Sequence, residues 1–332
     1  MTVTVEIESD SSSWNRYVEQ SSQAGVFHRY NALSVQADHA DAVVHRYVGH
    51  TDGDPLGVFP VFELRHGFIT TAFSPPPNLR VPYLGPALID ADSWDHHDRE
   101  RYTREFVEAV LNRMETSIGP WYVHLRTSDR YTDIRPLVWK GFESRSRHTY
   151  VVDLSVGPDD LMSSFSSDAR SNVTGTDEDA YEITVEGDEA IRDVFRQVRQ
   201  RYESQDIDFA VPTEFAVDLF EQLPDGVVRP YVLRTNGEFV GGILVLDDGN
   251  RISRWQGGVR IDSDLPANDL LDWHVMTDAI DRDRTEYDLV GADNERISDY
   301  KAKFAPELRS FTSMWRGSPG MSLLVSGYRK LA

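Results

Sequence analysis

Residues 287–304 combine residue types that could perform chemistry with the elements that could position them. Residues 287–290 predict a buried strand, Gly291 ends it, and a polar loop and a short helix with Lys301 follow. A charged loop at the end of a strand is where α/β proteins commonly place their functional groups. The chain has only four lysines, and two of them, Lys301 and Lys303, fall in this helix. The pattern favours a functional ammonium group over the alternative of two solvated lysines on a helix surface.

The cysteine and histidine content of the chain gives no indication of a second functional site. The chain has no cysteine, which excludes disulfides, thiolate metal sites and a cysteine nucleophile. His96 and His97 are adjacent, and adjacent side chains on a helix point apart, so we expect a solvated helix start and not a metal site. His28 and His274 are isolated histidines near apolar residues and are expected to be structural. We therefore predict no metal site.

The composition indicates an acidic globular protein. Of 332 residues, 55 are acidic and 34 are basic, which gives a net charge of −21 spread over all segments. Arginine in place of lysine, together with pervasive aspartate, is typical of proteins kept soluble in concentrated salt, so we expect a halophilic source. Such a surface disfavours a nucleic-acid partner such as tRNA at low salt, but concentrated salt screens the repulsion.

The length and the N-terminus suggest a two-domain protein of the cytoplasm. A chain of 332 residues is too long for one typical hydrophobic core and suits two domains. Residues 1–10 lack the basic and apolar regions of a signal peptide. No apolar run approaches the roughly 20 residues of a membrane span. We expect a cytoplasmic protein without a membrane span.

The two halves of the chain repeat one pattern. Residues 51–59 (TDGDPLGVF) and 235–243 (TNGEFVGGI) align without a gap, and each has an Asp-Gly or Asn-Gly turn between apolar runs. Such a turn predicts a β-hairpin. Each hairpin is followed by a further strand, a predicted helix (residues 94–117 and 268–281) and another strand. We favour a duplicated domain over two unrelated hairpins with common turn chemistry.

The second half ends this series with Tyr300-Lys301-x-x-Phe304. The order of elements and this motif resemble the FemAB/FemX-like branch of the GNAT acyltransferase superfamily, whose motif reads Phe-Lys-x-x-Phe. The resemblance implies an α/β (α+β) fold of two tandem GNAT-like domains, each a mixed, mostly antiparallel sheet flanked by helices. It implies a degenerate first domain over residues 1–152, and a second domain over residues 153–332 that carries the motif.

The resemblance also implies an activity. FemX-like enzymes transfer an aminoacyl group from charged tRNA to an amine of a cell-wall precursor, and other relatives N-acylate envelope or exopolysaccharide precursors. An N-acyltransferase acting on a sugar- or nucleotide-linked precursor, held between the halves, is therefore expected. Two alternatives are a non-catalytic binding module on the same scaffold and a CoA-dependent N-acetyltransferase of small molecules. Acyl-CoA and aminoacyl-tRNA are both candidate donors, no cofactor is expected to be permanently bound, and nothing indicates the oligomeric state.

Roles for the residues of the motif follow from this resemblance. Attack of an amine on an ester or thioester places negative charge on the carbonyl oxygen, and a fixed donor there is worth ~10²–10³ in rate. Lys301, which matches the family's lysine, is expected to supply it. Tyr300 would line the site, Phe304 would pack into the core and Lys303 would be solvated. Asp293 could accept the amine proton, with a loop cap or salt bridge as its alternative role.

Three residues are expected to contact anionic groups of the substrate. Arg170, Arg201 and Tyr202 fall where relatives place such contacts, and the arginine fork suits phosphate or carboxylate. Surface salt bridges are the alternative for the arginines in so acidic a chain.

A strand end is expected to face the donor. Trp255 and Gln256 would contact the ligand, and Gly257 and Gly258 would let it approach the backbone. An exposed strand end is the alternative. This segment does not match the Gln/Arg-x-x-Gly-x-Gly/Ala loop that binds the CoA pyrophosphate in ordinary GNAT enzymes, which argues against acetyl-CoA as the donor.

Overall fold

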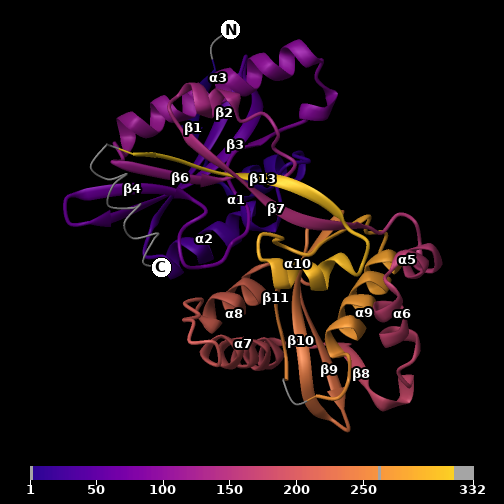
Figure 1. Cartoon of the computed structure of the whole chain (residues 1–332). Helices are drawn as coiled ribbons and strands as arrows, with labels where there is room; N and C mark the ends of the chain where they lie inside the picture. Colours follow the sequence, from indigo (N-terminus) through magenta and orange to yellow (C-terminus); the bar gives the residue numbers. More distant parts are fainter. Residues whose placement is uncertain (1–2, 261–262, 318–332) are drawn as a thin grey trace. The chain divides into compact units, whose positions relative to one another are not determined.

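The computed structural model describes residues 3–260 and 263–317 (Figure 1). These residues form two compact units. The first unit comprises residues 3–147 and 310–317, and the second comprises His148–Arg309. The chain enters the second unit within strand β7 (Glu143–Asp153) and leaves it within strand β13 (Glu307–Gly317).

The first unit contains strands in the order β1-β2-β3-β4-β6-β13, with the short β5 added to β3. Neighbouring strands are antiparallel except β4 and β6, which run parallel. A parallel pair requires a crossover connection, and helix α3 lies in the segment between these two strands. The strands are β1 (Thr4–Ile7), β2 (Val43–Thr51), β3 (Asp54–His66), β4 (Ile69–Ser74), β5 (Ala87–Leu88) and β6 (Tyr122–Arg126).

Helix α3 (His96–Ser117) supplies one side of the core of this unit. Asp95 caps it by accepting a hydrogen bond from the Asp98 backbone N–H at 2.8 Å. The helix buries the apolar stripe predicted from its periodicity: Phe106, Val107, Val110, Leu111 and Met114. The other helices of the unit are α1 (Ser11–Glu19), η1 (Val26–His28), α2 (Tyr30–His39), η2 (Ala91–Ser93) and α4 (Arg135–Trp139).

The second unit contains strands in the order β7-β12-β11-β10-β9-β8. All neighbours are antiparallel except β11 and β12, which run parallel on either side of helix α9 in the sequence. The strands are β8 (Glu182–Val185), β9 (Val228–Thr235), β10 (Glu238–Asp247), β11 (Arg251–Val259) and β12 (Glu286–Asp288). The helices are α5 (Pro158–Ser164), α6 (Ser167–Thr174), η3 (Glu178–Ala180), α7 (Asp188–Glu203), α8 (Thr213–Gln222), α9 (Ala267–Asp281) and α10 (Glu295–Ala302).

Two helices pack on this sheet from opposite faces. Helix α9 buries Leu271 and Val275 in a cluster with strand residues such as Ile243. Helix α7 lies against β10 and β11 (Figure 1). A Cβ atom on Gly242 would be only 2.6 Å from Val194 Cγ2. The absence of a side chain at residue 242 therefore sets how closely α7 approaches the sheet.

The topology confirms tandem GNAT-like domains of mixed, mostly antiparallel sheets. Both units have an antiparallel hairpin and a further strand, then a helix, then a strand parallel to the one before the helix. Both hairpin turns use two left-handed residues, Asp52 and Gly53 in the first unit and Asn236 and Gly237 in the second. This is the backbone of a type I′ turn, which the Asp-Gly and Asn-Gly pairs predicted.

The C-terminal strand differs from the expected domain limits of 1–152 and 153–332. Residues 310–317 belong to the first unit, because β13 pairs with β6 from Ser313–Arg126 to Gly317–Tyr122. A strand predicted from local sequence carries no information on which sheet it joins.

None of the helices within residues 3–260 and 263–317 is long and apolar enough to cross a membrane.

Candidate functional site

Lys301 lies in the last turn of α10 and is only 6% exposed. Its Nζ donates hydrogen bonds to the carbonyl oxygens of Val290 at 2.8 Å and Gly291 at 2.7 Å. Both carbonyls lie where the chain leaves β12 through two left-handed residues. An ammonium group has three N–H donors, so these two bonds orient it and leave one donor for another acceptor.

The environment of Lys301 makes its ammonium group easier to deprotonate. Burial lowers its pKa to about 8, and the positive charge of Arg254 contributes in the same direction. Asp288 and Asp272 oppose the shift. An amine with this pKa can hold or release a proton near neutral pH, which an ordinary surface lysine cannot do.

Asp272 is the centre of a buried polar network beside this lysine. It is fully buried on α9, and its Oδ1 accepts hydrogen bonds from Arg254 Nε at 2.9 Å and from the Tyr287 hydroxyl at 2.6 Å. Its Oδ2 accepts from the Tyr300 hydroxyl at 2.7 Å. A buried carboxylate is tolerated only when its oxygens are paired in this way. The network fixes Tyr300 and Arg254 on either side of one anion.

The same network shifts the pKa values of its members. Burial raises the pKa of the Tyr287 and Tyr300 hydroxyls well above the ordinary value, and the charge of Asp272 adds to the effect. Burial alone would lower the pKa of Arg254, but Asp272, with smaller contributions from Tyr287 and Tyr300, raises it by more, so the guanidinium stays charged. The tyrosines therefore act as hydrogen-bond donors and Arg254 as a permanent cation.

The sequence analysis missed Arg254, Asp272 and Tyr287 as members of the site. One signal was available, because Asp272 follows Leu270 and Leu271 on the apolar side of the predicted helix. A carboxylate on a buried face requires a partner. The partners of Asp272 could not be identified from the local sequence, because Arg254 and Tyr287 lie on two different strands.

A β-bulge aims Arg254 toward this network. The register of β10 with β11 changes between Leu244, which pairs with Gln256, and Val245, which pairs with Arg254. Bulges commonly re-aim side chains in this way. A Cβ atom on Gly257 would lie 3.3 Å from Arg254 Nη2, so the glycine leaves room for the guanidinium.

The four residues expected at the donor-facing strand end are mostly buried by packing within the second unit. Trp255 is 5% exposed and packs edge-to-face against Phe215, and Gln256 is also buried. At Gly258, a Cβ atom would lie 3.1 Å from the Val198 backbone N. The close approach that the glycine pair predicted is therefore made by α7 and Arg254. Binding of substrate or cofactor by Trp255, Gln256, Gly257 and Gly258 remains a prediction, because sequence cannot tell close helix packing from close ligand approach.

Asp293 and Lys301 are not in contact with each other. The Asp293 carboxylate accepts hydrogen bonds from the His148 backbone N–H and shares one with its Nδ1, both at 3.2 Å. These bonds hold the loop after β12 against β7, which agrees with the alternative role of Asp293 as a loop cap. Proton acceptance by Asp293 remains a prediction.

Arg170, Arg201 and Tyr202 lie on other elements. Arg170 Nη1 donates to the Ser163 carbonyl at 2.6 Å and so joins α6 to α5. Arg201 and Tyr202 are in the last turn of α7, and the Tyr202 ring packs on Phe209 with centroids 5.1 Å apart. Among the residues described, no contact links the three to Lys301, and their substrate role remains a prediction.

Lys303 is not solvated as expected. Its Nζ donates to Asp269 Oδ2 at 2.9 Å and lies 4.8 Å from the centre of the Tyr300 ring. Asn172 donates to the same carboxylate oxygen at 2.5 Å. Phe304 is fully buried, as predicted.

The start of α9 carries an acidic residue and a proline. A helix N-terminus attracts anions, and this is the helix that follows the pair of glycines. Here Asp269, only 3% exposed, places a carboxylate in the first turn, and Pro266 at the N-cap has no N–H to donate. This carboxylate, whose Oδ2 accepts from Lys303 and Asn172, adds negative charge where a pyrophosphate group would lie.

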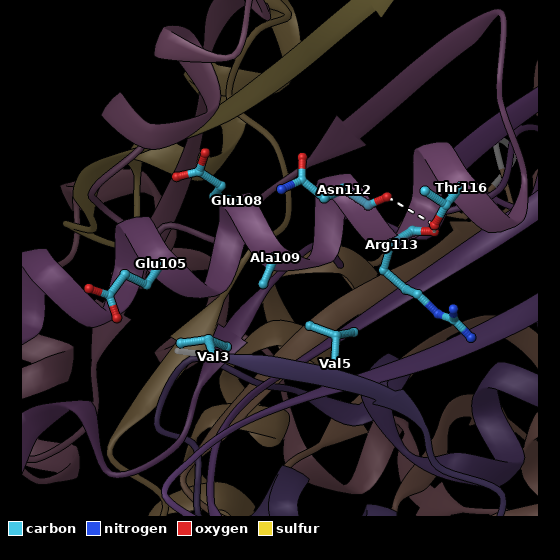
Figure 2. Close-up of a pocket in the computed structure, with 8 residues that line it drawn as sticks. All are labelled: Val3, Val5, Glu105, Glu108, Ala109, Asn112, Arg113 and Thr116. Carbon is cyan, nitrogen blue, oxygen red and sulfur yellow. Dashed lines mark hydrogen bonds between the residues drawn. The ribbon is translucent and has the colours of Figure 1, made fainter. Parts of the chain in front are cut away.

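An open groove lies elsewhere, in the first unit. It has a volume of about 590 Å³ between α3 and β1. Figure 2 shows Val3 and Val5 below Ala109, with Glu105 and Glu108 toward one end of the groove. No residue of the predicted site lies there.

The residues of the candidate site lie within a segment that resembles a known domain family. Residues 166–302 match the family described as the acetyltransferase (GNAT) domain, a span that includes Arg254, Asp272 and Lys301. No curated protein matches the chain in sequence.

Several solved structures share the fold over nearly the whole chain. FemX has a TM-score of 0.73 at 12% identity, covering 94% of this chain and 97% of FemX. L-PGS from Bacillus licheniformis has a TM-score of 0.58 at 13% identity, covering 96% of both chains. A conserved protein of unknown function from Bacteroides thetaiotaomicron VPI-5482 has a TM-score of 0.60 at 11% identity, covering 95% of this chain and 100% of that one. The expected resemblance to the FemAB/FemX-like GNAT branch is confirmed at the level of the fold.

Proposed function

Given a GNAT-type domain over residues 166–302 within a FemX-like fold, we propose that this protein is an N-acyltransferase. It moves an acyl or aminoacyl group to an amine of a sugar- or nucleotide-linked envelope or polysaccharide precursor. The observation that carries the proposal is the Lys301 ammonium group, which is buried, oriented by two carbonyls and has a pKa of about 8.

The proposed reaction forms one bond and breaks another at a carbonyl carbon. The acceptor nitrogen attacks, the C–N bond forms and the bond to the donor oxygen or sulfur breaks. The proton lost by the nitrogen ends on the departing oxygen or sulfur, which leaves as an alcohol or a thiol. Negative charge develops on the carbonyl oxygen between these events. The third N–H of Lys301 stabilises this charge in a water-poor environment, where one such donor is worth ~10²–10³ in rate.

The neighbouring residues act by positioning. Asp272 holds Tyr300 and Arg254 in fixed orientations, and Arg254 contributes to the lowered pKa of Lys301. Such preorganisation requires no covalent step by the protein.

The donor favoured by these residues is an acyl ester and not acyl-CoA. Asp269 and Pro266 at the start of α9 oppose a pyrophosphate group. Aminoacyl-tRNA carries an ester, but the net charge of −21 opposes its binding at low salt. Transfer from aminoacyl-tRNA is therefore expected to require salt high enough to screen that repulsion.

A direct assay tests the proposal. The full chain is incubated with aminoacyl-tRNA or acetyl-CoA and a panel of amino sugars and nucleotide-linked amines, and products are detected by mass spectrometry. We expect transfer by the wild type and by Lys140→Ala, a control lysine on the first unit. Lys301→Ala should lose ~10²–10³ in kcat while its circular dichroism stays native. Transfer that survives in Lys301→Ala would contradict the catalytic role.

A non-catalytic binding module is the second candidate. It is favoured by one observation, that two of the three Lys301 donors are already used by backbone carbonyls. In that case Lys301→Ala would chiefly lower stability, and no acceptor would be acylated by the wild type.

A further inference from the structure

The backbone segment that holds the Lys301 ammonium group has an unusual conformation. Val290 and Gly291, whose carbonyl oxygens accept from Lys301 Nζ, both have positive φ angles, 51° and 87°. Glycine adopts this left-handed region readily, but a β-branched residue such as valine is an outlier there. Such conformations persist only where the surrounding structure holds them, and they cluster at functional sites. The contacts that hold this segment therefore bear on how Lys301 is oriented.

The segment bulges away from strand β7 as the chain leaves β12. The Leu289 N–H donates to the Tyr150 carbonyl, and the Ala292 N–H donates to the His148 carbonyl, both at 2.8 Å. Three residue steps after β12 therefore face two steps on β7, which leaves one extra residue between the two hydrogen bonds. The extra residue takes the segment out of the regular ladder, so its carbonyl oxygens face the ammonium group in place of a neighbouring strand.

Two buried side chains bind the N–H groups of this segment. Asp288 Oδ1 accepts hydrogen bonds from the Val290 N–H at 2.8 Å and from the Thr149 hydroxyl at 2.6 Å. The Thr149 hydroxyl oxygen accepts in turn from the Gly291 N–H at 3.0 Å. Neither Asp288 nor Thr149 is exposed, so water does not compete for these hydrogen bonds.

Every backbone polar group of Val290 and Gly291 therefore has a partner. Their N–H groups donate to Asp288 and Thr149, and their carbonyl oxygens accept from Lys301. The two side chains replace the hydrogen bonds that a neighbouring strand would otherwise supply. Removal of the Thr149 hydroxyl would take away the partner of the Gly291 N–H and one of the donors to Asp288 Oδ1.

The charge of Asp288 also acts on the ammonium group. Burial lowers the pKa of Lys301, and the negative charge of Asp288 opposes that shift. Asp288 Oδ2 lies 3.8 Å from Arg251 Nη1, so its carboxylate is also part of a buried ion pair. A substitution of Asp288 would change both charge and geometry, whereas a substitution of Thr149 changes the geometry alone. Thr149 is therefore the residue whose substitution tests the geometry.

We propose that Thr149 and Asp288 are positioning residues, which hold the segment of Val290 and Gly291 and thereby orient the Lys301 ammonium group. When both carbonyl oxygens are fixed, the two N–H groups that donate to them set the direction of the third. The catalytic effect of this orientation, which is to aim the third N–H at the carbonyl oxygen of the donor, rests on the proposed transfer reaction. The orientation of the ammonium group itself does not.

The orientation is measured without substrate, from the rate at which lysine ammonium protons exchange with water. The chain has only four lysines, so the full-length protein with ¹⁵N-labelled lysine gives few signals, and Lys301→Met identifies that of Lys301. We expect slow exchange at about pH 6, where the group is charged, because it is buried and bonded to two carbonyls. Thr149→Val should speed this exchange by about 10-fold. The exchange of Lys303, which donates to Asp269, should stay unchanged and serves as an internal reference.

The transfer assay measures the catalytic consequence. Thr149→Val should lower kcat by about 10-fold or more and change KM little, because a misplaced donor weakens the transition state and not substrate binding. Thr149→Ser keeps the hydroxyl and should keep slow exchange and most of kcat. Thr103→Val is the matched control, because it removes an equally buried hydroxyl from helix α3 of the first unit. It should change neither the exchange rate of Lys301 nor kcat.

The outcomes separate this proposal from the proposed function. Faster exchange in Thr149→Val, together with no transfer by the wild type, would support the positioning role and count against the transferase function. Exchange at the wild-type rate in folded Thr149→Val would overturn the positioning role, as would equal exchange rates in Thr149→Val and Thr149→Ser. If Thr149→Val does not fold, Thr149→Ala and Thr149→Ser, which differ only in the hydroxyl group, give the same comparison.

Discussion

Asp272 Oδ1 lies 2.9 Å from Arg254 Nε, and this ion pair joins helix α9 to strand β11 inside the second unit. Asp272 is fully buried, so neither charge could remain there without the other. The pair also places the Arg254 guanidinium near Lys301, and this positive charge lowers the pKa of the Lys301 ammonium group. One interaction thereby links the packing of the domain to the acidity of its candidate catalytic group.

Replacement of Asp272 by Asn should strongly destabilise the second unit. The change leaves Arg254 buried without a counter-charge, and breaking a buried pair from one side costs about 3–5 kcal/mol. Urea unfolding followed by circular dichroism measures the loss. Asp193→Asn, which breaks the more exposed pair with Arg196, is the control and should change stability little. Equal effects of the two substitutions would show that the Asp272 network does not hold the domain together.

Stability attributable to Lys301 should increase with pH above about 8. The folded protein releases this proton near pH 8, whereas the unfolded chain holds it to the ordinary pKa of 10.5. Between these values the unfolded chain binds more protons, so the free energy of unfolding rises with pH.

The gain should reach up to about 3 kcal/mol as pH approaches 10.5. Lys301→Met has no titrating group at this position. The difference in the free energy of unfolding between wild type and variant therefore isolates the contribution of Lys301 from that of all other groups. Urea unfolding of both proteins at several pH values gives that difference. A difference that stays constant from pH 7.5 to 10 would mean that the pKa of Lys301 is not lowered in the folded state.

Replacement of Arg254 by Gln should raise the pKa of Lys301. The positive charge of Arg254 favours the neutral amine, and its removal favours the ammonium form. If transfer requires the ammonium form, kcat/KM of the wild type falls above about pH 8, and this fall should move to higher pH in Arg254→Gln. The shift of the alkaline limb, and not the overall rate, is the informative measurement. If the alkaline limb does not move, a group other than Lys301 causes the fall in kcat/KM.

Replacement of Gly242 by Ala should destabilise the protein by overpacking. The new Cβ would lie 2.6 Å from Val194 Cγ2 and 2.8 Å from the Tyr231 carbonyl oxygen, so α7 or β9 must shift. Such changes cost about 1–3 kcal/mol. Gly187→Ser is a suitable comparison, because a Cβ there meets nothing within 4 Å and serine is a favoured N-cap for α7. Thermal unfolding should show a lower midpoint for Gly242→Ala only.

Local patterns in the sequence were sufficient for the duplicated architecture. The Asp52-Gly53 and Asn236-Gly237 turns, the apolar stripe of α3 and the strand before Gly291 each depend on neighbours within a few residues. Such signals survive without knowledge of the rest of the fold. The same is true of Lys301, which scarcity of lysine and the Tyr-Lys-x-x-Phe motif both indicated.

The composition of the site required the assembled fold, because its members are distant in sequence. Asp272 meets Arg254, Tyr287 and Tyr300 only when a helix, two strands and a second helix pack together. The glycines after Trp255 predict a close approach, but only the assembled fold places α7 and Arg254 against them. The type of a residue determines which interactions its side chain can make, and long-range packing determines which partner the side chain contacts.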